Sequence, residues 1–115
     1  MSRTYTEEES FEAKLFDKSN PLKGEYENCT FRGCKFASSN FHEIIFVECE
    51  FQECDFSMAN LKSASFRDVR FVRSKMLGLR FDECNSLLLS FSFTGCLLNY
   101  SSYHKLKLKK IHVIV

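Results

Sequence analysis

Four cysteines raise the question of a metal site. Cys29 and Cys34 are five positions apart, and Cys49 and Cys54 repeat that spacing twenty residues later. A structural zinc site needs four ligands that converge on one point at about 2.3 Å, usually from pairs two to four residues apart. Cysteine also serves as a small apolar side chain in tightly packed walls. We expect buried structural thiols here, with no metal ion and no cofactor.

The three histidines do not form a catalytic pattern. His42, His104 and His112 have no serine, cysteine or carboxylate partner at a consistent spacing. The chain also lacks a glycine-rich phosphate loop and an H-E-x-x-H motif. We therefore predict that the protein is not an enzyme and has no catalytic residue.

The dominant pattern is a large apolar residue at every fifth position from Tyr26 to Phe81. A helix repeats every 3.6 residues and a strand every two, so neither explains a period of five. A short fixed period is typical of repeat proteins, whose units bury their apolar sides by stacking. The predicted core consists of Phe31, Phe36, Phe41, Phe46, Phe51, Phe56, Leu61, Phe66, Phe71, Met76 and Phe81.

A second position, two residues before each large one, holds small or apolar residues and no charge. From residue 29 to residue 84 it reads Cys29, Cys34, Ser39, Ile44, Cys49, Cys54, Ala59, Ala64, Val69, Ser74, Leu79 and Cys84. Two positions in five thus point inward and three outward. We call the inward positions the central place and the small place. The shared position of the cysteines favours packing over ligation.

Four sides of five residues would close a coil, so residues twenty apart would lie one β-ladder spacing apart, about 4.8 Å. Exposed ion pairs are worth about 0.2–1 kcal/mol, and their value here is as a test of the coil length. The expected neighbours of opposite charge are Glu50 with Arg70, Glu53 with Arg73, Lys62 with Asp82, and Asp55 between Lys35 and Lys75.

The segment FSMANLKSASF, residues 56–66, resembles the pentapeptide repeat family. The family's loose signature is A(D/N)LXX, which Ala59, Asn60 and Leu61 match. The resemblance covers at least residues 24–84. It implies an all-β fold, namely a right-handed quadrilateral, or four-sided, β-helix solenoid of about four coils.

The pattern suggests two regions and one interruption. Residues 1–23 are expected to form a short N-terminal cap over the first coil, although Phe11 and Phe16 are in phase. Residues 24–115 are expected to form the β-helix, with a register break at about residues 85–92, where two extra residues make either a bulge or a loop. The period then resumes with Phe93, Leu98, Tyr103, Leu108 and Val113 in the central place, and Phe91, Cys96, Ser101, Leu106 and Ile111 in the small place.

The charge is unevenly distributed. Residues 1–60 carry 6 Lys and Arg against 12 Asp and Glu, a net charge of −6, whereas residues 61–115 carry 10 against 3, a net charge of +7. The basic half is either a solvated face paired with the acidic coils or an interaction surface. Nucleic acid is not the expected partner, because no aromatic residues alternate with the outward basic ones. The candidate interaction surface is Arg67, Arg70, Arg73, Lys75 and Arg80.

The sequence predicts a cytoplasmic protein. The acidic start MSRTYTEEES lacks the apolar core of a secretory signal, and the most apolar stretch, SLLLSFSFTGCLLNY, is too short to span a bilayer. The C-terminal segment KLKLKKIHVIV ends as an apolar strand, and the open edge of the last coil leaves two alternatives: a homodimer through the C-terminal coil or a ragged, aggregation-prone end.

Two functions remain open. The first is a non-catalytic scaffold that presents a rigid β-helical surface to a protein partner of unknown identity. The second is implied by the resemblance, since some pentapeptide repeat proteins mimic DNA and thereby protect DNA gyrase or topoisomerase IV from quinolones or gyrase poisons. Only residues 1–60 carry the acidic charge that a DNA mimic needs.

Overall fold

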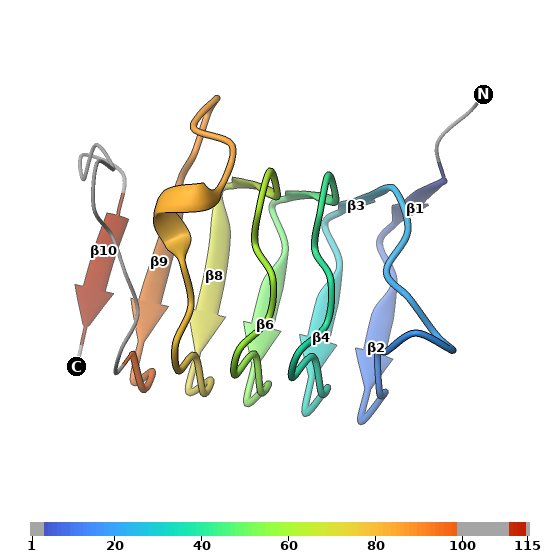
Figure 1. Cartoon of the computed structure of the whole chain (residues 1–115), viewed down its shortest axis with the longest axis horizontal. Helices are drawn as coiled ribbons and strands as arrows, with labels where there is room; N and C mark the ends of the chain where they lie inside the picture. The colour runs from blue at the N-terminus through green and yellow to red at the C-terminus, as the bar shows by residue number, and fades with distance from the viewer. Residues whose placement is uncertain (1–3, 99–110, 115) are drawn as a thin grey trace.

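The computed structural model describes residues 4–98 and 111–114, which form an all-β solenoid of short parallel strands (Figure 1). One sheet has the strand order β1-β3-β5-β7 and the other β10-β9-β8-β6-β4-β2. The strands of the first sheet are β1 (Tyr5–Glu7), β3 (Glu25–Glu27), β5 (Ile45–Val47) and β7 (Ser65–Arg67). Those of the second are β2 (Ser10–Glu12), β4 (Thr30–Arg32), β6 (Glu50–Gln52), β8 (Val69–Val72), β9 (Phe91–Thr94) and β10 (Ile111–Ile114).

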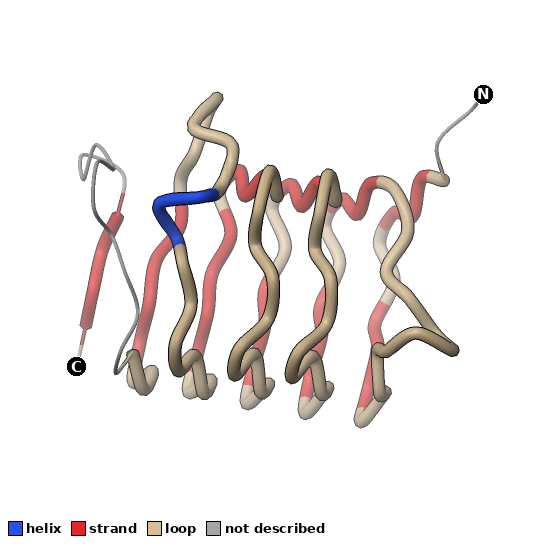
Figure 2. Tube along the Cα trace, in the orientation of Figure 1, coloured by secondary structure: helices blue, strands red, loops and turns tan. Residues whose placement is uncertain are grey.

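The pairing register confirms a coil of twenty residues. Phe31 pairs with Phe51 and Phe46 with Phe66, each in a parallel ladder. The other two sides of each coil run mostly as turns, held by single bridges such as Lys35 to Asp55. In Figure 2 strands therefore occupy two sides of the stack and loops the remaining two. The fold is the expected four-sided β-helix of about four coils.

Most sides of the coils end in a residue with left-handed backbone conformation, two places after the central residue. Glu48 has φ of 52° and Ser63 has φ of 61°, although neither is glycine. This conformation costs a residue with a Cβ about 1–2 kcal/mol, which stacking of the coils must offset. Gly78 meets the same need at φ of 69° and also makes room, because a Cβ there would lie 2.5 Å from Met58 Sδ.

The interior consists of columns of stacked aromatic rings. All eleven predicted core side chains are buried, each with an exposed fraction of 2% or less. Along a column the rings lie nearly parallel, as in Phe36 over Phe56 with centroids 4.8 Å apart and planes 8° apart. Between columns they meet edge to face, as Phe46 and Phe51 do at 5.2 Å and 74°. Both geometries are the favoured ones for aromatic pairs.

The N-terminal segment is itself a coil, which corrects the expectation of a separate cap laid over the first coil. β1 pairs with β3 and β2 with β4, in the same twenty-residue register as the later strands. Phe11 stacks on Phe31 at 4.8 Å, and Phe16 stacks on Phe36 at 4.9 Å. These two rings are in phase with the columns, so they continue the core, Phe11 from β2 in the second sheet and Phe16 from the side held by the bridge of Leu15 with Lys35.

The pairing offset changes from 20 to 22 at the short 3-10 helix η1 (Phe81–Glu83) and the loop that follows it. β9 pairs with β8 so that Val69 lies opposite Phe91 and Phe71 opposite Phe93. β10 then pairs with β9 at an offset of 20, with Val113 opposite Phe93. Of the other predicted central positions in the shifted frame, Leu98 packs against the core, whereas Tyr103 and Leu108 lie outside the described residues.

Candidate functional site

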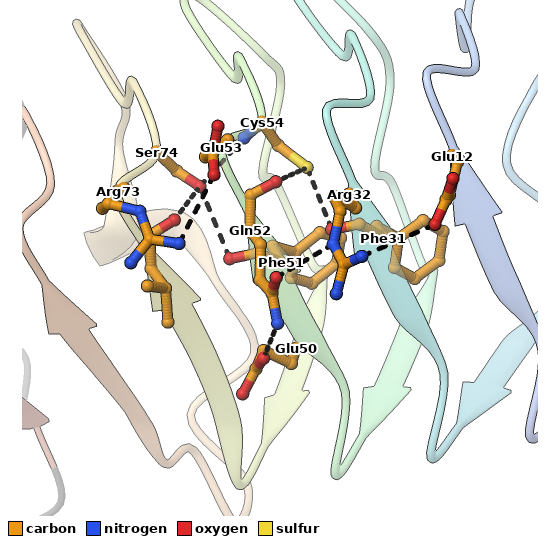
Figure 3. Close-up of polar contacts among 11 residues, drawn as sticks. Glu12, Phe31, Arg32, Glu50, Phe51, Gln52, Glu53, Cys54, Arg73 and Ser74 are labelled. Atoms are coloured by element: carbon orange, nitrogen blue, oxygen red, sulfur yellow. Dashed lines mark hydrogen bonds and ion pairs between the residues drawn. The ribbon is translucent and has the colours of Figure 1, made fainter.

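Charged side chains form a ladder on the outward face of the second sheet (Figure 3). Arg32 lies 3.6 Å from the Glu12 carboxylate and donates from Nε to Gln52 Oε1 at 3.1 Å. Gln52 in turn donates to Glu50, whose other oxygen accepts from Arg70 Nε at 2.8 Å. The guanidinium of Arg70 is the main cause that holds the pKa of Glu50 below its usual value. Ion pairs and hydrogen bonds thus connect these side chains across four coils.

Two of the predicted charge pairs are confirmed directly. Arg70 pairs with Glu50 at 2.8 Å, and Arg73 pairs with Glu53 at 3.4 Å. For the predicted pair of Lys62 and Asp82, the local turn gives Asp82 a partner that the twenty-residue spacing did not suggest. Asp82 accepts two hydrogen bonds from Arg80, its neighbour two positions away, at 3.0 and 2.7 Å.

Asp55 lies between two lysines, as the spacing suggested. Its backbone bridges to Lys35 in the preceding coil and to Lys75 in the following one. Partial burial opposes ionisation, but hydrogen bonds from Ser57 and the charges of Lys75 and Lys35 outweigh it and lower the pKa of Asp55.

The five residues of the candidate basic surface lie on different sides of the fourth coil. Arg67 belongs to β7 in the first sheet, and Arg70 to β8 in the second. Arg73 follows β8 at the corner, Lys75 bridges on the third side, and Arg80 precedes η1. Three of the five carry an ion pair to a carboxylate in the described structure. The structure therefore does not bring them together as one unpaired cationic patch.

A loop at residues 84–90 replaces the strand that a further coil would add to the first sheet. Figure 1 shows it projecting between η1 and β9. Asn85 N–H donates to the Ala64 carbonyl at 2.8 Å, and Ser90 N–H donates to the Phe66 carbonyl at 3.0 Å. Between these anchors Leu87 and Leu88 are 61% and 67% exposed. The loop thus exposes two leucines to solvent, while its two ends are held by hydrogen bonds to the first sheet and its neighbouring turn.

Phe91 fills the interior space behind this loop. The residue occupies a small place by sequence, yet its ring is buried and stacks on Phe81 with centroids 5.4 Å apart. It also meets the Phe66 ring edge to face at 6.2 Å. Because the loop carries the backbone away from the first sheet, that side lacks a central side chain, and Phe91 substitutes for it.

The small-place cysteines bond to the backbone of the preceding coil. Cys49 Sγ donates to the Tyr26 carbonyl and Cys54 Sγ to the Phe31 carbonyl, both at 3.3 Å. Ser74 holds the same place in the next coil and donates to the Phe51 carbonyl at 3.5 Å. The small place therefore accommodates a hydrogen-bond donor, a feature that the sequence pattern did not indicate. All six cysteines are free thiols.

The described residues contain no group of three or more His, Cys, Asp or Glu side chains placed to hold a metal ion. His42 is exposed, with Nδ1 3.1 Å from the Lys62 carbonyl and Nε2 3.4 Å from the Glu43 carboxylate. His104 lies outside the described part of the chain. Nor does any helix between residues 4 and 98 or 111 and 114 have the length and apolarity to cross a membrane.

Comparison with known proteins gives a family and a fold. A family model described as pentapeptide repeat region matches residues 25–85 and again residues 44–113. The structure of full-length QnrB1, a plasmid-mediated fluoroquinolone resistance protein, is similar with a TM-score of 0.60 and 22% sequence identity. The match covers 87% of this chain and 49% of the QnrB1 chain, so this chain spans about half the length of QnrB1.

A second structural match is weaker. The pentapeptide repeat protein Rfr23 from the cyanobacterium Cyanothece 51142 matches with a TM-score of 0.35 and 13% identity, over 95% of this chain and 83% of that one. A search of the curated proteins found no match to this sequence.

Proposed function

This chain belongs to the pentapeptide repeat family, and on that premise we propose that it is a non-catalytic scaffold that binds a protein partner through the loop at residues 84–90. The observation that carries this proposal is the pair of exposed leucines, Leu87 and Leu88, on an anchored loop. Two adjacent large apolar side chains exposed to water, on a loop hydrogen-bonded at both ends, favour contact with another protein. An ordered loop also loses little conformational freedom on binding.

The anchoring of the loop supports a preformed binding element. Leu89, the next residue, packs against the core, and the Ser90 carbonyl accepts from Val69 N–H at 3.0 Å. Leu87 N–H donates to the Asn85 side-chain oxygen at 3.0 Å, which turns the chain at the tip. The partner would therefore meet an apolar protrusion of defined shape.

A scaffold role without catalysis is supported by the chemistry of the remaining polar groups. The ladder of Glu12, Arg32, Glu50 and Arg70 is internally paired, and the thiols bond to backbone carbonyls. None of these groups is placed as a nucleophile beside a general base. We accordingly assign no catalytic residue and no cofactor to the protein, and we place it in the cytoplasm, where free thiols persist.

Site-specific photo-crosslinking tests the loop as a binding element. A photoreactive amino acid at Leu88 should give a discrete crosslinked protein in cells, and Leu87→Ser with Leu88→Ser should abolish the complex. Met58 offers a matched control, because it is also 67% exposed and has a similar φ of 59° against 57° for Leu88. Equal crosslinking from Met58 and Leu88, or none from Leu88, would refute this role for the loop.

Protection of a type II topoisomerase is the second candidate function. The fold similarity to QnrB1, described as a fluoroquinolone resistance protein, favours it. The acidic first coils add support, whereas the basic later coils and the shorter chain weigh against a complete DNA mimic. Gyrase supercoiling with a fluoroquinolone, across a titration of this protein, tests the idea. Restored supercoiling at micromolar protein would support it, and unchanged inhibition with folded protein would reject it.

A homodimer through the C-terminal coil is the third part of the proposal. β10 is the last strand of its sheet in the described residues, so one of its edges is open to pairing with a second copy. The mass measured by light scattering after size exclusion should be twice that of the 13.5 kDa chain. A monomer at all concentrations up to the millimolar range would contradict this part alone.

A further inference from the structure

Arg67 differs from the other arginines between residues 4 and 98, because it lacks a carboxylate partner there. Those others each pair with an Asp or Glu side chain at 2.7–3.6 Å; they are Arg32, Arg70, Arg73 and Arg80. Every Asp and Glu of the sequence falls within the same range of residues. The Nε–H of Arg67 is buried and finds no acceptor in the described structure. The side chain as a whole is only partly buried, so a group from outside the chain can approach the guanidinium.

The pairing register explains why Arg67 has no partner. Arg70 lies opposite Glu50 in the second sheet, whereas Arg67 lies opposite Val47 in the first. On its other side β7 is the last strand of its sheet in the described residues, and the loop at residues 84–90 follows there. Neither Val47 nor this loop contains a carboxylate. The ladder that pairs the arginines of the second sheet therefore does not extend to Arg67.

The exposed leucines of the loop lie close to Arg67. Ser90 N–H donates to the Phe66 carbonyl, and the Ser90 carbonyl accepts from Val69 N–H, both at 3.0 Å. These bonds flank Arg67, so Ser90 lies beside it. Because hydrogen-bonded strands are about 4.8 Å apart and two residues of chain span at most about 7 Å, the Cα atoms of Leu88 and Arg67 lie within about 12 Å of each other. About four residues of an extended partner segment cover that distance.

Building on the proposed scaffold function, we propose that Arg67 and the loop at residues 84–90 form one binding site for a protein segment that carries an acidic side chain near apolar ones. The acidic side chain pairs with the Arg67 guanidinium, and the apolar side chains cover Leu87 and Leu88. Arginine suits this role, because its planar guanidinium can bind a carboxylate through two parallel hydrogen bonds. The charge pair fixes the register of the segment and disfavours basic partners.

The surroundings of Arg67 favour a protein carboxylate over the phosphates of a nucleic acid. Tight binding to a phosphate backbone needs several available cations. Arg70 and Arg73 are already paired with Glu50 and Glu53. The two exposed leucines offer no side-chain donor to a phosphate or a base edge. One guanidinium beside two leucines therefore fits a short segment that is both acidic and apolar.

Selection from a random peptide library displayed on phage, against the full-length protein, tests the chemistry of the partner. Enriched peptides should contain an Asp or Glu close to large apolar residues, and a synthetic peptide of that sequence should bind more weakly as salt rises. Amidation of its acidic side chain should lower the affinity about tenfold or more. Enrichment of basic peptides, of apolar peptides without a carboxylate, or of no peptide would overturn the proposal, as would preferential binding of duplex DNA.

Variants of Arg67 separate binding from stability. Arg67→Met keeps an apolar stem and should lower the affinity for the selected peptide about tenfold or more. Its urea midpoint should be unchanged or higher, because the variant removes a buried N–H without an acceptor. Arg67→Lys should retain part of the affinity, since lysine keeps the charge but loses the planar fork. Arg70→Met, which removes an arginine already paired with Glu50, is the matched control and should leave the affinity unchanged.

The leucine variants distinguish this inference from the scaffold function on which it rests. Leu87→Ser with Leu88→Ser should abolish binding of the selected peptide. If this double variant loses binding and Arg67→Met does not, the loop is a binding element and the role of Arg67 is wrong. If neither variant loses binding, the peptide binds elsewhere and both proposals fail. A lower urea midpoint for Arg67→Met would show that the guanidinium stabilises the fold, which would also overturn the inference.

Discussion

Phe51 lies directly over Phe31, with ring centroids 4.7 Å apart and ring planes 11° apart. The next ring in this column, Phe71, lies 5.2 Å from Phe51. Phe51 is fully buried, so it contributes both burial and stacking to each neighbouring coil. This column joins the acidic N-terminal coils to the basic later ones.

Replacing Phe51 by alanine should therefore destabilise the protein strongly. We expect Phe51→Ala to lower the free energy of unfolding by about 3–5 kcal/mol, because the ring leaves a cavity between two stacked neighbours. Urea denaturation followed by circular dichroism measures the change. Arg32→Ala, on the outward side of the adjacent strand, should cost less than about 1 kcal/mol. A loss below 1 kcal/mol for Phe51→Ala would contradict the stacked-column account of stability.

The ion pair between Glu50 and Arg70 should be weak but measurable. A double-mutant cycle with Glu50→Gln and Arg70→Gln should give a coupling free energy of about 0.2–1 kcal/mol, smaller at high salt. The more exposed pair of Glu53 and Arg73, at 3.4 Å, should couple less. Equal coupling of both pairs would indicate that geometry and exposure do not control these contacts.

Ser74 should tolerate cysteine better than alanine. Its hydroxyl oxygen accepts from the buried Cys54 N–H at 3.1 Å. Ser74→Ala leaves that N–H without this acceptor, which should cost about 1–3 kcal/mol in unfolding free energy. Ser74→Cys should cost less, since Cys54 and Cys96 occupy the same column. The comparison of both variants by thermal and urea denaturation decides whether the small place selects for hydrogen bonding or only for size.

The buried thiol of Cys49 should make stability fall at alkaline pH. Burial raises its pKa to about 12, whereas an unfolded cysteine has a pKa of about 8.5. Below about pH 8 both states keep the proton, so Cys49 adds no pH dependence. Between about pH 9 and 12 only the unfolded state loses the proton, and stability should fall by up to about 1.4 kcal/mol per pH unit.

Cys49→Ser removes this titration and should flatten the alkaline slope. Urea denaturation of the two proteins at pH 7.5, 9 and 10 measures the difference. Parallel slopes across this range would show that the Cys49 thiol ionises as readily in the folded protein as in the unfolded chain.

The repeat itself could be predicted from sequence because each side of the coil is local. A central residue such as Phe46, and the small residue two positions before it, identify the inward positions within five residues. The coil length of twenty then followed from closing four sides, and it predicted the contact of Glu50 with Arg70, which the structure shows at 2.8 Å. Ion pairs between residues that are not twenty apart, such as Arg80 with Asp82, depend on the local turn. The spacing of the repeat could not predict them.

Other features were decided only by the tertiary structure. The sequence shows Phe11 and Phe16 in phase, but only the ladder of β2 with β4 and the bridge of Leu15 with Lys35 show that they belong to a coil rather than to a cap. That the basic residues lie on different sides of the coil also becomes visible only in the folded four-sided structure. Phe91 is the clearest case, because the two extra residues allowed either a bulge or a loop. Its burial against Phe81 follows from the space that the departing loop leaves. Local backbone geometry decides which positions point inward or outward. How the space behind the loop at residues 84–90 is filled depends instead on contacts between side chains far apart in sequence.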